Sequence, residues 1–233
     1  MALWLLGYPE AARTDAHAAV MQAREIGQAA TLMYALVINP FTHFHCGDYA
    51  TANAQLDEAL QLADQKDAVF WKAWGLMQRG CVLALIGEPA GAIDSITAGI
   101  TAWRSTGSTL YLPLYQTYLA TSFAMIGQFH DAHRCIDEAV TTMETTKEKW
   151  GEAELNRTAG EIALKWLQPD AAKAQALFER ALNIARQQQA KSYELRAAMS
   201  LARLWRDQGK VQQARELLAP VYGWFTEGST RAI

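Results

Sequence analysis

The sequence predicts an all-α protein, an α-α superhelix of about five and a half antiparallel helix pairs. Glycines recur forty residues apart, at Gly7, Gly47, Gly87 and Gly127, and small and apolar residues recur at fixed distances around them. A strand pattern, alternating β-branched residues bounded by turns, is not found. Each glycine therefore marks an equivalent place in a repeated unit.

The residues that follow each glycine have the sizes that a helix pair requires. An alanine follows these four glycines, and Gly209, by five residues, and a mostly large apolar residue follows by nine. A small residue follows the first four by twelve. These intervals place one stripe on a single helix face, and glycine permits the positive φ that ends the preceding helix. Each unit is therefore expected to be an αα-hairpin.

The hairpins can be placed along the chain in order, as one domain over residues 1–228. The units are expected near residues 1–28, 29–67, 68–107, 108–148, 149–190 and 191–228, followed by a disordered tail at 229–233.

The first unit lacks most of a helix, because only six residues precede Gly7 where other first helices have room for about sixteen. We therefore expect a fragment of a longer protein, and self-association through its truncated N-terminal end.

Prolines mark helix starts and one kink. Pro9, Pro89 and Pro169 fall at the starts of second helices, and Pro113 falls near the start of a first helix, where a missing N–H costs little. Pro40 instead lies inside the first helix of the second unit, so a kink is expected between about Leu36 and Pro40. The fifth unit departs from the pattern, because its turn, "WLQPDAAKA", is longer and has no glycine.

The repeated order of small residue, glycine, alanine, large apolar residue and small residue resembles the tetratricopeptide repeat. The unit is 40 residues long here instead of 34, as in MalT-like variants. Residues 214–228, "ARELLAPVYGWFTEG", are similar to the C-terminal segment of bacterial proteins that join a class III adenylate or guanylate cyclase and an ATPase module to a helical-repeat tail. The resemblance implies a segment of a larger cytoplasmic signalling protein whose nucleotide chemistry belongs to other domains.

Composition and charge exclude several partners. A formal net charge of -3 and a pI near 6.0, without long runs of one sign, argue against nucleic acid or an anionic membrane as the main partner. Three widely spaced cysteines argue against a disulfide framework and favour a reducing cytoplasm. No segment approaches the roughly 18 apolar residues of a membrane span.

Catalysis, cofactors and metals are not expected. Phosphate-binding, dinucleotide-binding, serine-hydrolase and zinc-protease motifs are missing from the sequence. The stretch "HFHC" suggests a metal site, but on a helix His43 and His45 point about 200° apart, and His43 with Cys46 supplies too few ligands. His43 and Cys46 also stand where other units have apolar residues, so both are expected in the core.

The candidate binding residues lie on the first helices, which line the concave face in superhelices of this type. They are Tyr34, Phe41, Phe44, Trp74, Met77, Arg157, Arg196, Arg203 and Arg206. An exposed aromatic groove that runs into a basic end would bind a peptide or partner helix with an apolar stretch and an acidic end. Two alternatives remain open: the aromatic end packs against missing repeats or other domains of the same chain, or the chain senses a small molecule stacked on Trp74 and Tyr34.

Overall fold

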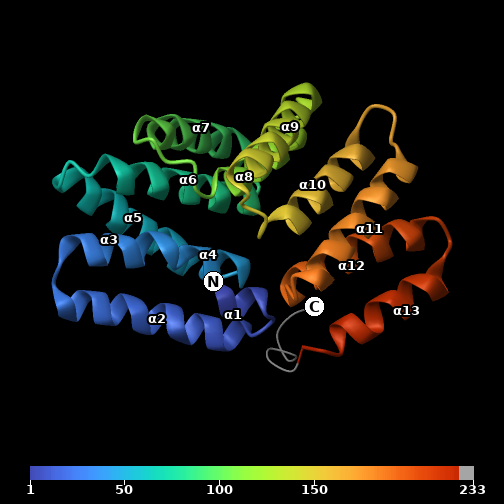
Figure 1. The fold of residues 1–233 in the computed structure, drawn as a ribbon, viewed down its shortest axis with the longest axis horizontal. Coiled ribbons are helices and arrows are strands. Elements are labelled where there is room, and N and C mark those ends of the chain that lie inside the picture. The colour runs from blue at the N-terminus through green and yellow to red at the C-terminus, as the bar shows by residue number, and fades with distance from the viewer. Residues whose placement is uncertain (226–233) are drawn as a thin grey trace.

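A computed structural model describes residues 1–225, and the regular secondary structure of this part is α-helical, as the sequence predicts. The helices follow one another as antiparallel pairs around a curved body (Figure 1). In chain order they are α1 (Ala2–Leu5), α2 (Pro9–Ile26), α3 (Ala29–Ile38), α4 (Pro40–His45), α5 (Tyr49–Gln65), α6 (Val69–Ile86), α7 (Pro89–Ser105), α8 (Leu112–Met125), α9 (Phe129–Thr146), α10 (Glu152–Lys165), α11 (Ala171–Gln187), α12 (Lys191–Asp207) and α13 (Val211–Tyr222).

The turn glycines have the backbone conformation that the repeat requires. Gly7, Gly47, Gly87, Gly127 and Gly209 all have positive φ, from 77° to 90°. Small residues then let the paired helices approach closely. A Cβ added at position 99, on α7, would lie 2.6 Å from the side chain of Met77 on α6. Glycine is needed there because no side chain fits between the two helices.

The first helix of the second unit is broken where the sequence predicts a kink. Helix α3 ends at Ile38 and α4 begins at Pro40, with Asn39 between them. Proline lacks the N–H for the helical hydrogen bond and its ring crowds the preceding turn, so the helix is interrupted here. Figure 1 shows the two segments as separate helices.

The fifth unit ends its first helix without a positive-φ glycine. Its turn is closed instead by Asp170, whose carboxylate accepts from the backbone N–H of Lys173 at 2.8 Å and caps α11. Helix α11 begins two residues after Pro169, which lies in the turn.

The superhelix closes on itself, because the first unit contacts the last. Helix α1 lies against the beginning of α12 (Figure 1). The hydroxyl of Ser192 donates to the carbonyl of Trp4, and the rings of Tyr8 and Trp224 lie 5.5 Å apart. The concave side is therefore enclosed. Among residues 1–225, none of the helices is long and apolar enough to cross a bilayer, and the predicted tail, 229–233, lies outside the described residues.

Candidate functional site on the concave face

Most of the predicted aromatic surface is buried. Phe41, Phe44, Trp74 and Met77 have exposed fractions of 4% or less, whereas Tyr34 is 51% exposed. The indole N–H of Trp74 donates to the hydroxyl of Tyr115 at 2.7 Å, which satisfies its polar group inside the molecule. The expectation of an exposed aromatic groove was therefore wrong for these four side chains.

The side chain of Trp4, on α1, packs into the concave face. Its ring meets those of Phe41 and Tyr193 edge-on, at 5.7 Å and 5.6 Å between centroids, and that of His45 at 4.3 Å. These partners come from α4 and α12, in the second and sixth units. The N-terminal ammonium of Met1 also donates to the Thr42 hydroxyl at 3.2 Å. Sequence reasoning missed this arrangement, because it treated "MALWLLG" as an incomplete repeat.

The space left at the centre is very small. A cavity of about 10 Å³ is lined by Met1, Phe41, Trp74, Gln78 and Trp150, among others. A single water needs about 10–15 Å³ by this measure. This cavity therefore has no room for a peptide or a sugar while α1 stays in place.

His45 lies within this aromatic cluster as a neutral ring. Its Nδ1 is 2.8 Å from the carbonyl of Phe41, and its Nε2 is 3.1 Å from the hydroxyl of Tyr118. One tautomer satisfies both contacts: Nδ1–H donates to Phe41, and Nε2 accepts from Tyr118. Burial lowers the pKa of His45 to about 3, with the nearby Arg196 charge acting in the same direction. Both ring nitrogens are thus occupied by internal partners.

His43 and Cys46 lie apart from that ring. His43 is buried, as its place in the repeat predicts, with Nε2 3.3 Å from the amide nitrogen of Gln55. Cys46 is half-buried against the core, and burial raises the pKa of its thiol to about 11. Within residues 1–225, histidine, cysteine and carboxylate side chains form no group of three or more that could hold a metal ion.

The arginines of the predicted basic end are paired with carboxylates. Buried Glu154, on α10, accepts bidentate hydrogen bonds from Arg157 and from Arg196, at 2.7–3.1 Å. Glu161 accepts from Arg157, Ser200 and Arg203. Burial alone would raise the pKa of Glu154, but the two guanidinium groups outweigh it and hold that pKa below its ordinary value.

The arginines are consequently not a free anion site. Arg206 pairs with its neighbour Asp207, at 2.9 Å, and is the most exposed of the four. The sequence analysis named the arginines of this end but did not anticipate that the carboxylates of Glu154 and Glu161 lie between them.

Comparison with known proteins supports the fold and no more. No protein-family model matches the chain, and no curated protein matches it. Among solved structures, the chain is similar to the crystal structure of BtubC (BKLC) from P. vanneervenii, with a TM-score of 0.64 and 17% sequence identity. The match covers 92% of this chain and 90% of that one. At this identity the similarity establishes a shared helical-repeat architecture. The finer tetratricopeptide and cyclase resemblances have no family match behind them.

Proposed function

We propose that this chain is a non-catalytic protein-interaction or regulatory repeat domain, and that its ligand is an apolar helix that replaces α1 on the concave face. The observation that carries the proposal is the packing of Trp4 against Phe41, His45 and Tyr193. A large aromatic side chain in a well-packed pocket is the usual anchor of a protein interface. Here the chain's own first helix supplies that anchor.

Helix α1 is suited to displacement. It has four residues and no side-chain cap, and a helix this short is not stable in water without its contacts. It is held by the Trp4 ring, by the bonds from Ser192 and Met1, and by Leu3 and Leu5, which pack against the core. A partner helix of three or more turns would bring a similar ring and bury further apolar side chains along the groove.

The setting of the domain is part of the proposal. The resemblance of residues 214–228 to cyclase and ATPase fusion proteins supports a larger cytoplasmic signalling protein, in which the occupant of the groove is another domain or a separate protein. The same proposal includes self-association, in which α1 of one molecule would occupy the concave face of another. The net charge of -3 supports neither nucleic acid nor membrane as partner.

The alternative is a MalT-like domain that senses a sugar. Only one of the two aromatic side chains predicted to stack on that sugar is accessible. Trp74 is buried and hydrogen-bonded to Tyr115, so among the two predicted stacking residues only Tyr34 faces solvent.

A peptide-binding experiment tests the proposal. The Trp4→Ala variant should bind a synthetic peptide of residues 1–8, MALWLLGY, labelled for fluorescence anisotropy, because its aromatic pocket is vacated. The wild type should bind it much more weakly, and the same peptide with alanine in place of tryptophan should not bind either protein. Circular dichroism checks that the variant is folded. Equal binding to variant and wild type, or no binding to a folded variant, would contradict the proposal.

A further inference from the structure

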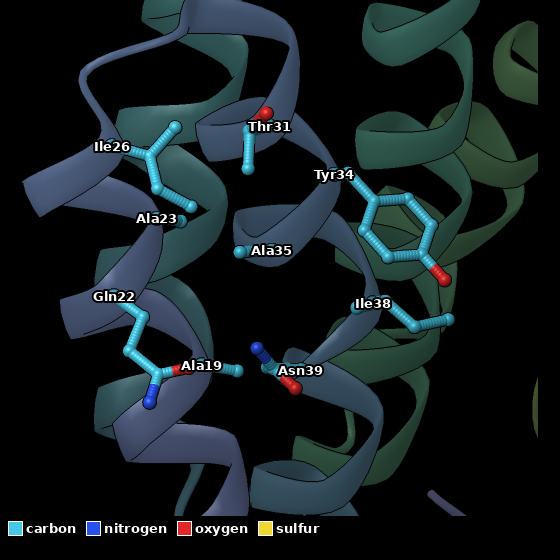
Figure 2. A pocket seen from close by; sticks show the side chains of 9 residues that line it. All are labelled: Ala19, Gln22, Ala23, Ile26, Thr31, Tyr34, Ala35, Ile38 and Asn39. Carbon is cyan, nitrogen blue, oxygen red and sulfur yellow. The ribbon is translucent and has the colours of Figure 1, made fainter.

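A groove between α2 and α3 borders the concave face at Tyr34 and Ile38, and the peptide proposal does not use it (Figure 2). Its volume is about 230 Å³, and it opens to solvent. Three small side chains, Ala19, Ala23 and Ala35, leave the space free, and Ile26 and Ile38 supply apolar walls. At ~30 Å³ of liquid per water molecule, the groove holds the equivalent of about eight waters. A compact organic molecule would fit.

One polar side chain in this groove is buried without a partner. Asn39 is 8% exposed, and its amide nitrogen has no hydrogen-bond partner in the described part of the chain. Figure 2 shows this amide at one end of the groove, with the nitrogen directed toward α2. A buried amide donor that lacks an acceptor destabilises the folded state. The groove therefore presents a donor that an incoming acceptor would satisfy.

The local backbone explains why Asn39 has no internal partner. Asparagine at the start of a helix usually caps it, and Asn39 directly precedes α4. Capping requires an extended backbone, but Asn39 has φ -75° and ψ -29°, which is helical. Asn39 keeps this conformation although the proline that follows it disfavours a helical backbone, and its side chain faces the groove (Figure 2). Asn156 is equally buried, yet its amide donates to the Glu152 carbonyl at 2.8 Å.

We propose that the α2–α3 groove binds a compact, neutral, apolar molecule that carries a carbonyl oxygen, such as an aryl or alkyl amide. The carbonyl accepts from Nδ2 of Asn39, while the apolar body packs against Ala23, Ile26 and Ile38. None of the lining side chains is charged, which favours a neutral ligand over an ionic one. The groove is not lined by Trp4, Phe41, His45 or Tyr193, which carry the peptide proposal, so the two proposals are tested by different residues and either can fail alone.

The test compares two probes that differ in one oxygen. Acetanilide carries the carbonyl, and N-ethylaniline has the same skeleton without it. Each is titrated into the isotope-labelled full-length chain while backbone amide resonances are followed by NMR. Acetanilide should shift the resonances of Ala23, Ala35 and Asn39 in a saturable way. N-ethylaniline should bind about fivefold more weakly, the worth of one hydrogen bond.

Three variants separate a ligand site from chance contact. Ala19→Phe fills the groove from its exposed side and should abolish both titrations. Asn39→Leu should erase the preference for acetanilide and raise the Tm, because no hydrogen bond is lost. Asn156→Leu, the matched control, should lower the Tm and leave both titrations unchanged. Equal binding of the two probes, no saturable shifts, binding that persists in Ala19→Phe, or a fall in Tm for Asn39→Leu would overturn the proposal.

Discussion

Protonation of His45 should destabilise the folded protein as the pH falls below neutrality. The ordinary histidine pKa is 6.5, and burial in the aromatic cluster lowers it to about 3. The unfolded chain therefore takes up the proton first, and the stability present above pH 6.5 is lost progressively as the pH falls toward 3. Protonation lowers the stability of the folded state because Nε2 must stay unprotonated to accept from Tyr118.

The size of the effect follows from the two pKa values. Each pKa unit corresponds to about 1.4 kcal/mol, and pH 5 lies about 1.5 units below the unfolded pKa. His45 should thus cost about 2 kcal/mol of unfolding free energy between pH 7.5 and pH 5. The full difference, near pH 3, would approach about 5 kcal/mol.

Urea unfolding followed by tryptophan fluorescence measures this loss. The wild type and His45→Gln are compared at pH 7.5 and pH 5. Glutamine is neutral at both, and the other histidines are present in both proteins, so their contributions cancel. The free energy of unfolding of the wild type should fall by about 2 kcal/mol more than that of His45→Gln between pH 7.5 and pH 5. A constant difference would show that His45 is protonated as readily in the folded protein as in the unfolded chain, and would refute the half-buried, neutral ring.

Three further substitutions test the packing and the ion-pair network by the same unfolding assay. Gly99→Val should cost about 3 kcal/mol, because its Cβ would meet Met77 at 2.6 Å and backbone atoms at 2.9–3.0 Å; a loss below 1 kcal/mol would mean that the helices can separate. Glu154→Gln should lower the free energy of unfolding by about 3 kcal/mol, since it leaves Arg196 without its carboxylate partner. No change would mean that the ion pairs are exposed to solvent. Asp170→Ala removes the α11 cap and should cost about 1 kcal/mol; no change would show that another group satisfies the Lys173 N–H.

The repeat pattern predicted the helices well, because their positions depend on local features. Turn glycines, small contact residues and prolines at helix starts determine structure within one hairpin. Each can be recognised from the sequence alone. The break at Pro40 belongs to the same class. His43 was also assigned to the core correctly, because equivalent positions in other units are apolar.

The concave face could not be predicted in the same way, because its surroundings depend on how far the superhelix turns. Phe41 packs against Trp4, and Trp4 in turn packs against Tyr193, so rings from units at the two ends of the chain meet there. The accumulated rotation per unit decides whether those ends meet, and no single repeat encodes it. The pairing of Glu154 with Arg196 depends instead on how two neighbouring units stack.

The contact between the first and last units changes how this molecule should unfold. In an open stack of repeats each unit touches only its neighbours, so the terminal units fray and stability accumulates unit by unit. Here Ser192 and Trp4 join positions 188 residues apart, and neither end lacks a neighbour. Loss of the contact between α1 and α12 would expose both helices at the same time. Amide protons in α1 and at the beginning of α12 should therefore exchange with solvent together.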